Sequence, residues 1–149
     1  MKFIQIPKKS GGFRTICQPD GKLKRKLRTI LNTSLNTKQL LYCNPEIVHG
    51  FMPMRSIVTN ASKHIGFKYT LSIDIKDFFD SVKPEMVQKY LSQEEINNCF
   101  IDGHIYQGLP TSPAIANLAA VELDKHIENL CSYHFSTNSN GDTNLKWVY

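Results

Sequence analysis

The sequence lacks the features that would place the protein in or across a membrane. No run of about 18 apolar residues occurs in its 149 residues, which argues against a transmembrane helix and a membrane partner. Its first residues, MKFIQIPKKSGG, lack the apolar core and cleavage site of a secretory signal. No C-x-x-C pair is present, so the four cysteines predict reduced thiols rather than a disulfide framework or a zinc site. We therefore expect a globular cytoplasmic protein.

Acidic residues are scarce at the N-terminal end. Half of the chain's 18 Lys and Arg lie within residues 1–28, where Asp20 is the single acid, and the remainder of the chain is slightly acidic. Such a basic region suits a polyanion, because each Lys or Arg that meets a phosphate releases a condensed counterion. A solvated basic surface without a partner explains the charge equally well, so charge alone leaves both interpretations open.

The apolar pattern predicts a mixture of short strands and amphipathic helices. Apolar residues at 3–6 and 13–17 flank a Lys-Lys-Ser-Gly-Gly turn and predict a β-hairpin. Leucines and isoleucines from Leu23 to Leu35 recur at helical spacing. Residues 44–66 predict a loop and then a short helix. Strict alternation over residues 69–75 predicts a half-buried strand.

The remaining elements follow from start signals. Pro84 opens a helix with an apolar stripe at Met86, Val87, Tyr90 and Leu91. The sequence Thr-Ser-Pro at 111–113 joins a capping hydroxyl to a proline, and predicts a helix that runs to about Leu130. The segment STNSNGDTN is expected to be a polar loop, and LKWVY to begin another strand.

Asp74 is the first candidate for chemistry. Alternation places it on the polar side of the expected strand, near the end, where a carboxylate could bind Mg²⁺ together with substrate phosphates. The turn that follows, at residues 76–79, exposes backbone N–H groups that could meet a triphosphate. Capping is the competing interpretation: Asp74, Asp77 and Asp80 could simply hold a turn and the next helix. For this motif taken alone, capping is the commoner role.

A second motif, QGLPTSPAIAN at 107–117, changes that balance. Its small residues would let a backbone or a nucleotide approach closely, although an alanine-rich helix packed on a sheet would look the same. Together with DIKDFFDSV at 74–82, it resembles two core motifs of reverse transcriptases, in particular the retron, group II intron-like and antiphage-defence enzymes of bacteria. Three upstream segments are similar to that family in the same order: KKSGGFRTICQP, GKLKRKLRTIL and HGFMPMRSIVTNASKHIG.

The resemblance implies an α+β fold, the fingers and palm of a right-hand polymerase. Residues 1–68 would form a fingers-like region, and residues 69–149 part of a palm whose antiparallel sheet packs on helices. The implied activity is RNA-directed DNA polymerisation, in which Mg²⁺ and a dNTP extend a primer 3′-hydroxyl on an RNA template. A structured non-coding RNA is a further expected partner, in the bacterial cytoplasm.

The resemblance also implies roles for individual residues. Asp74 would be the catalytic metal ligand, with the Ile75 carbonyl beside it. Phe79 would contact the sugar and exclude a 2′-hydroxyl. The expected nucleotide-binding residues are Lys8, Lys9, Arg14, Asp77, Phe78, Phe79, Gln107 and Gly108. The expected nucleic-acid-binding residues are Lys22, Lys24, Arg25, Arg28, Arg55, Asn60, Pro110, Ser112 and Asn117. One small departure is Ile105-Tyr106, where the family often has Leu-Pro.

A larger departure is the family's Tyr-x-Asp-Asp motif, which this sequence lacks, together with a thumb domain. The reaction uses two metal ions about 3.5–4 Å apart, and one carboxylate holds such a pair poorly. We therefore expect the chain by itself to be inactive. Three interpretations remain: a piece of a longer enzyme, one subunit of a split enzyme whose second chain brings the missing motif, and a non-catalytic RNA-binding module.

Overall fold

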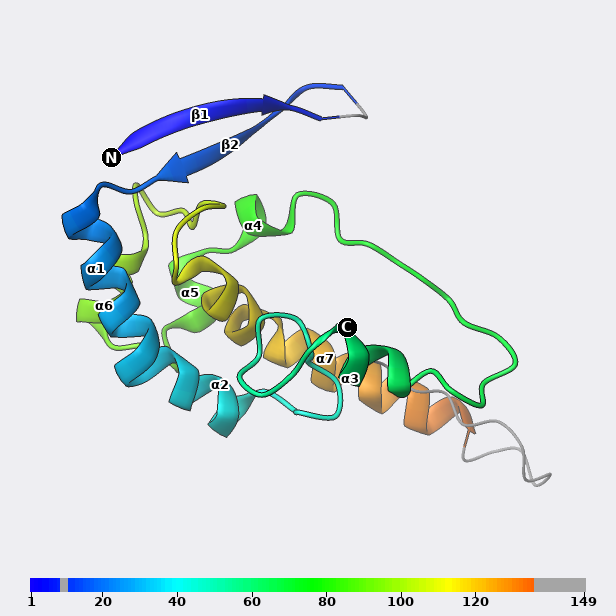
Figure 1. Ribbon diagram of the computed structural model, residues 1–149. Helices are drawn as coiled ribbons and strands as arrows, with labels where there is room; N and C mark the ends of the chain where they lie inside the picture. The colour runs from blue at the N-terminus through cyan, green and yellow to red at the C-terminus, as the bar shows by residue number, and fades with distance from the viewer. Residues whose placement is uncertain (9–10, 136–149) are drawn as a thin grey trace.

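A computed structural model of the chain describes residues 1–8 and 11–135, with side chains as far as Cys131 (Figure 1). The elements, in chain order, are β1 (Lys2–Pro7), β2 (Phe13–Gln18), α1 (Gly21–Ile30), a π-helical turn η1 (Leu31–Leu35), α2 (Asn36–Tyr42), α3 (Ile57–Ser62), α4 (Phe78–Ser81), α5 (Pro84–Val87), α6 (Gln93–Cys99) and α7 (Ser112–Phe135). Among the described residues, no helix combines the length and the apolar character needed to cross a membrane.

The N-terminal hairpin forms as the sequence predicts. Strands β1 and β2 pair antiparallel, in a register that runs from Lys2 opposite Gln18 to Pro7 opposite Phe13. Gly12 adopts a φ of +77°, a left-handed conformation that glycine reaches without steric cost. Figure 1 shows the hairpin lying along one side of the helices rather than within them. Most of its residues are exposed, and Cys17 is its buried anchor.

The predicted amphipathic helix is also confirmed, and it continues as α1, η1 and α2. The Asp20 carboxylate caps its start by accepting a hydrogen bond from the Leu23 N–H at 2.9 Å. Leu27 and Leu35, at 1% and 0% exposure, lie on the face that the apolar spacing marked. The wider π-helical turn at Leu31–Leu35 includes Ser34, whose side chain points to a neighbouring helix.

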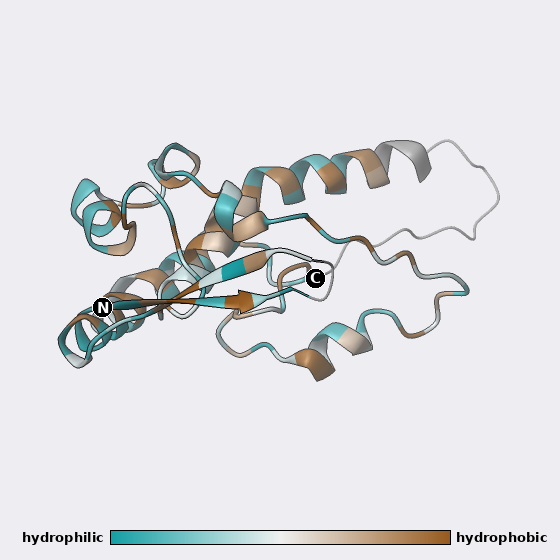
Figure 2. Ribbon diagram, turned by 90° about the horizontal axis from the view of Figure 1, so that it is seen from above, coloured by the Kyte–Doolittle hydropathy of each residue, from teal (hydrophilic) through white to brown (hydrophobic). Residues whose placement is uncertain are grey.

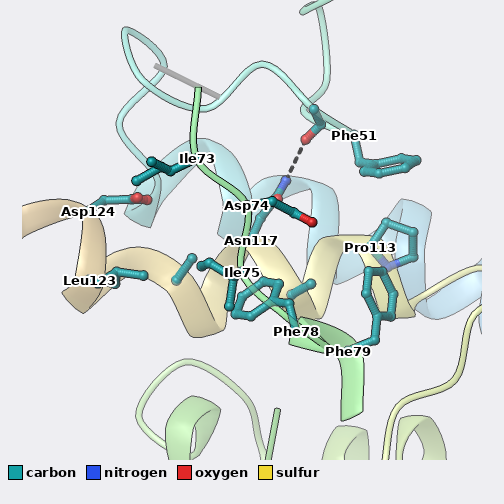
Figure 3. Close-up of a pocket in the computed structure, with 13 residues that line it drawn as sticks. Phe51, Ile73, Asp74, Ile75, Phe78, Phe79, Pro113, Asn117, Leu123 and Asp124 are labelled. Atoms are coloured by element: carbon teal, nitrogen blue, oxygen red, sulfur yellow. Dashed lines mark hydrogen bonds between the residues drawn. The ribbon is translucent and has the colours of Figure 1, made fainter. Parts of the chain in front are cut away.

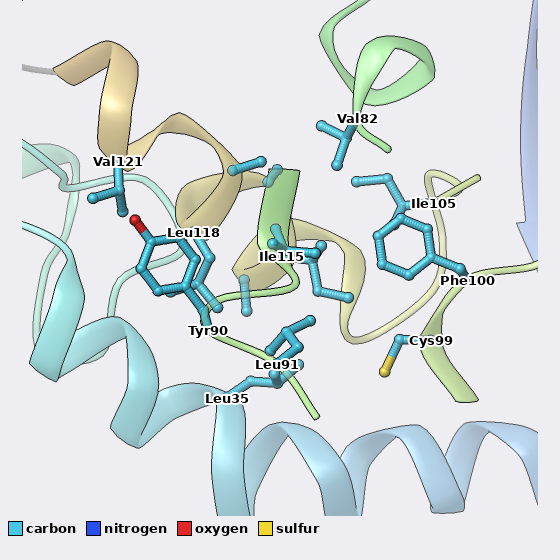
Figure 4. Packing of buried hydrophobic residues seen from close by; sticks show 14 of the residues in the cluster. Leu35, Val82, Tyr90, Leu91, Cys99, Phe100, Ile105, Ile115, Leu118 and Val121 are labelled. Atoms are coloured by element: carbon cyan, nitrogen blue, oxygen red, sulfur yellow. The ribbon is translucent and has the colours of Figure 1, made fainter. Parts of the chain in front are cut away.

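Helix α7 is the centre of the core (Figure 4). It packs against α2 and α5, and its buried residues Ile115 and Leu118 are fully enclosed. It begins at Ser112 as expected and runs to Phe135, somewhat beyond the expected end. The hydroxyls of Thr111 and Ser112 are buried without making a capping hydrogen bond, so that part of the prediction is wrong.

The strand predicted at residues 69–75 does not form, and this is the main correction to the expected fold. The segment is extended but unpaired, and the side chains of Tyr69 and Leu71 are more than four-fifths exposed. A strand needs a neighbour to take up its N–H and C=O groups. Within the described residues the only sheet is the hairpin, and the strand expected at LKWVY lies outside them, as does the expected polar loop. Figure 2 shows apolar residues along this extended segment.

The short helices differ from expectation mainly in length. Helix α3 forms with a capping box between Ser56 and Thr59, and Pro84 opens a helix as predicted, although α5 ends at Val87. Helices α4 and α6 were not predicted. The start of α6 does carry a sequence signal, because Ser92 and Glu95 form the S-x-x-E capping box.

Glu95 also joins α6 to the neighbouring helical segment formed by η1 and α2. Its carboxylate is 14% exposed and accepts hydrogen bonds from Lys38 and Ser34, each at 2.5 Å. Burial raises the pKa of this carboxyl, but the hydrogen bonds from Lys38, Ser34 and Ser92 outweigh burial and lower the pKa to about 2.

Candidate active site

A polar cavity of about 800 Å³ lies between the hairpin and the segment that follows residue 73. Its walls come from three parts of the chain that are far apart in sequence: the hairpin, residues 74–80 and Gln107. Of the expected metal and nucleotide residues, it gathers Lys8, Arg14, Asp74, Ile75, Asp77, Phe78, Phe79 and Gln107. Lys9 lies outside the described residues. One cavity therefore combines cations, carboxylates and an aromatic pair.

Lys8 and Asp77 connect the two sides of this cavity. The Lys8 Nζ donates a hydrogen bond to the Asp77 Oδ1 at 2.6 Å, across 69 residues of sequence. This hydrogen bond and the lysine's charge hold the pKa of the Asp77 carboxyl below its usual value. Asp77 precedes α4 with a left-handed φ of +51°, and its side chain makes no cap bond to that helix. For Asp77, the capping interpretation is therefore wrong.

Gln107 and Gly108 fix the base of the hairpin. The Cys17 N–H donates to the Gln107 carbonyl at 2.8 Å, and Ile16 and Gln107 form a parallel bridge. Gly108 has a φ of +98°, and a Cβ there would lie 2.4 Å from the Cys17 carbonyl oxygen. No side chain fits into that space, so the structure gives Gly108 a packing role. Gly108 does not line the polar cavity, and its predicted nucleotide contact stays a prediction.

A second, apolar cavity of about 260 Å³ lies on the other side of the same segment (Figure 3). It shares Asp74, Ile75, Phe78 and Phe79 with the polar cavity, and its remaining wall includes small residues of α7 such as Ala116 and Ala120. Ala116 of the second motif therefore lines this cavity, and the expected close approach of a backbone or a nucleotide to the small residues stays a prediction.

Phe51 is a lining residue that sequence reasoning missed. Its ring is 74% exposed at the edge of the apolar cavity, and its backbone has a φ of +55°. A left-handed conformation at a bulky residue is uncommon, and such residues collect at functional sites. The sequence offers only the neighbouring Gly50 and Pro53 as turn signals, and neither marks Phe51 itself.

Asn117 explains how the loop that carries Phe51 is held. It is 6% exposed, and its amide donates hydrogen bonds to the Gln39 Oε1 and the Gly50 carbonyl, both at 2.8 Å. Figure 3 shows the bond to Gly50. Ser112 is fully buried. Both side chains are shielded from solvent, and their expected contact with nucleic acid stays a prediction.

The other expected nucleic-acid residues lie nearer the surface. On α1, Lys22, Lys24, Arg25 and Arg28 are all exposed. Arg55, Asn60 and Pro110 are half-buried, and Arg55 lies 3.9 Å from Glu46. The basic part of the chain therefore includes one helix that presents several cations to solvent, beside a hairpin that presents Arg14.

Asp74 is exposed at the boundary of both cavities, which suits a metal ligand. In the part of the chain that the structure describes, however, no group of three or more His, Cys, Asp or Glu side chains could hold a metal ion. Mg²⁺ commonly takes one or two carboxylates and completes its shell with substrate phosphates and water. The donors present fit one carboxylate position of such a site.

The hairpin, residues 74–80 and Gln107 thus border the polar cavity, and α7 borders the apolar cavity that shares part of the same segment. The family model described as reverse transcriptase (RNA-dependent DNA polymerase) matches residues 6–138. This chain belongs to the reverse transcriptase family.

Several curated relatives that the chain resembles are retron reverse transcriptases. The chain is 31% identical over 152 residues to the retron Mx65 reverse transcriptase of Myxococcus xanthus, covering 84% of this chain and 35% of the relative. It is 33% identical to the Escherichia coli retron Ec73 and Ec86 reverse transcriptases, over 82% and 77% of this chain and 44% and 38% of the relatives. The chain thus spans less than half of the length of each of these relatives.

Proposed function

We propose that this chain forms the fingers region, residues 1–68, and part of the palm, residues 69–149, of a retron-type RNA-directed DNA polymerase. In this proposal it supplies the dNTP-binding side of the active site. The observation that carries the proposal is the polar cavity, which places Arg14 and Lys8 of the hairpin on the same space as Asp74 and Phe79.

The cations of the hairpin would bind the triphosphate. Arg14 is exposed and presents a fork of donors that matches phosphate oxygens, and Lys8 adds a point charge. The amides of Asp77 and Phe78 would face the same phosphates, and Lys9 would assist from the hairpin turn. Binding would thus depend on charges from two segments that meet only in the folded chain.

Asp74 would hold Mg²⁺ through its carboxylate, with the Ile75 carbonyl beside it. When bound, the metal pair would stabilise the attacking and leaving oxygens of the phosphoryl transfer. Since the described residues contain no group of three or more side chains that could hold a metal ion, we propose that further acidic ligands come from outside them and that residues 1–149 alone do not extend a primer.

Phe79 would select the sugar. It is half-buried, lines both cavities and follows Asp74 by five residues, so its ring borders the space next to the metal ligand. A ring in this position would leave no room for a 2′-hydroxyl and would favour dNTPs over NTPs. Gln107, anchored to β2 through its backbone, would contact the nucleotide from the opposite wall.

The exposed cations of α1 would bind the sugar-phosphate backbone of the RNA template and primer. Their contacts would contribute affinity without reading sequence, because phosphates carry no base information. The named relatives are retron enzymes, and we propose that a structured non-coding RNA is the partner of this helix as well.

The test is dNTP binding to the purified chain in Mg²⁺, measured by calorimetry and compared with NTP binding. We expect Asp74→Asn to weaken the Mg²⁺-dependent binding at least about tenfold, because a carboxylate ligand to the metal is lost. Asp102→Asn is the matched control, since Asp102 is also exposed and lies outside both cavities.

Two results would overturn parts of the proposal. If the wild-type chain binds RNA but no dNTP, the polymerase role is wrong and a non-catalytic RNA-binding role remains. If residues 1–149 extend a primer and Asp74→Asn abolishes the extension, the chain is catalytically complete and its proposed inactivity is wrong.

A further inference from the structure

An ion pair of Lys8 with Asp77, at 2.6 Å, joins the hairpin turn to the rest of the protein. Lys8 lies at the start of the turn, where its N–H donates to the Gly12 carbonyl. The far end of the hairpin is held separately, through Cys17 and Gln107. The ion pair is therefore a local connection across the polar cavity, between the hairpin turn and the residue that precedes α4.

This pairing is unexpected for a cavity that is proposed to bind a polyanion. The carboxylate of Asp77 is bound to the Lys8 amine, which is the group that a triphosphate would use. A phosphate oxygen and a carboxylate oxygen both accept hydrogen bonds from this charged donor, so the two compete for it. Asp74 and Asp80 line the same cavity, and no contact with Lys8 is found for either of them. Asp77 is thus the acid whose position competes directly with a phosphate.

The ion pair of Lys8 with Asp77 can also be broken with little loss of stability. The Lys8 and Asp77 side chains are 31% and 42% exposed, and solvated ion pairs of this kind contribute little net stability. The Asp77 side chain does not cap α4, whereas its backbone carbonyl accepts hydrogen bonds from Asp80 and Ser81. Release of the carboxylate therefore leaves the start of α4 intact.

We propose that the Asp77 carboxylate is an internal counter-ion that holds Lys8 in the empty cavity and lowers the affinity for nucleotide by competing with the triphosphate. This inference rests on the proposed function, because it takes a triphosphate as the ligand of Lys8. On binding, the amine exchanges one anionic partner for another, and the hairpin turn changes its attachment from the protein to the nucleotide.

The experiment compares Asp77→Asn with Asp80→Asn. Both variants remove one negative charge from the same cavity, and only Asp77 is paired with Lys8. Asn adopts left-handed backbone conformations as readily as Asp, so the φ of +51° at residue 77 is retained. We expect Asp77→Asn to bind dNTP with Mg²⁺ about two- to fivefold more tightly than Asp80→Asn does, the range expected for release of an exposed ion pair.

A second experiment combines Lys8→Met with Asp77→Asn in a double-mutant cycle. In the Lys8→Met background, Asp77→Asn is expected to change the dNTP dissociation constant no more than Asp80→Asn does, since the competing pair is already gone. Binding of tripolyphosphate without metal should show the same pattern, because the competition involves phosphate alone.

Each other outcome overturns the inference in a recognisable way. Equal effects of Asp77→Asn and Asp80→Asn would show that only the net charge of the cavity matters. Weaker binding by Asp77→Asn would show that the carboxylate assists the nucleotide instead of competing with it. Both results leave the proposed function standing, whereas absence of dNTP binding by the wild-type chain would overturn the function and this inference together.

Discussion

The polar and apolar cavities share the wall formed by Asp74, Ile75, Phe78 and Phe79, and differ in almost everything else. The polar cavity is closed by a hairpin that is largely exposed and is held to the protein at a few points. The apolar cavity is closed by α7, the most deeply packed helix of the described structure, and by a loop tied to that helix. Most charged lining residues therefore belong to the side of the exposed hairpin, and most apolar lining residues to the side packed on α7, where Asp124 adds one charged residue.

This difference indicates a division of roles across a single short segment. Groups that bind and release a charged ligand benefit from a mobile attachment, whereas groups that define a geometry need a packed support. Asp74 lies on the boundary, with cations on one side and the core helix on the other. Substitutions on the polar side should consequently change ligand affinity, and substitutions on the apolar side should change stability.

Arg14→Ala removes the main exposed cation of the polar side and carries the largest expected effect. A hydrogen bond to a charged group contributes about 1.5–3 kcal/mol, so we expect the dissociation constant for dNTP to rise roughly 10- to 100-fold with no loss of thermal stability. Calorimetric titration measures the first and thermal unfolding the second. Arg14→Lys keeps the charge but not the fork of donors, so its dissociation constant for dNTP should lie between those of the wild type and Arg14→Ala. Unchanged affinity in Arg14→Ala would show that the polar cavity does not bind the triphosphate.

Asn117→Ala damages the apolar side. It removes two hydrogen bonds and leaves the fully buried Gln39 side chain with an unmatched acceptor. We expect the free energy of unfolding to fall by about 1–3 kcal/mol, while dNTP affinity changes less than Arg14→Ala changes it. Urea denaturation gives the stability. The control is Asn97→Ala, at an exposed position on α6 with one hydrogen bond to Gln93, which should cost far less. Equal losses from both variants would contradict the structural role of Asn117.

Glu95→Gln, remote from both cavities, should alter stability alone and has the smallest expected effect on binding. Because the folded pKa of about 2 lies below the ordinary value of 4.5, the carboxylate stabilises the fold fully above pH 4.5 and progressively loses that contribution as the pH falls toward 2. We expect Glu95→Gln to be less stable by about 1–3 kcal/mol at pH 7 and to show a flatter decline over that acidic range. Denaturant titrations at several pH values measure both. A parallel decline in the two proteins would show that Glu95 does not contribute to acid sensitivity.

The elements that the sequence predicted well are those that complete their own hydrogen bonds. Helix α7 and the helix from Gly21 to Tyr42 satisfy their backbone groups internally, so apolar spacing and cap residues were enough to locate them. The hairpin pairs with itself through a short turn. Residues 69–75 carry an equally clear alternation, but a strand depends on a partner elsewhere, and local sequence cannot supply one.

The candidate site divides in the same way. The motifs around Asp74 and Gln107 identified the residues that share the polar cavity, because family motifs preserve local chemistry. The contact of Lys8 with Asp77 joins residues 69 positions apart, and the exposed Phe51 results from how α7 holds its loop. Both are consequences of tertiary packing, and no local pattern encodes them.

Gly108 has a mechanical consequence for the hairpin. The space left by its missing side chain lets β2 press directly onto the backbone at Gln107, and a hydrogen bond fixes the contact. A side chain larger than hydrogen at position 108 would force this contact apart and displace the end of the hairpin that lies opposite Lys8. Gly108 thus helps to position a wall of the polar cavity although it does not line that cavity itself.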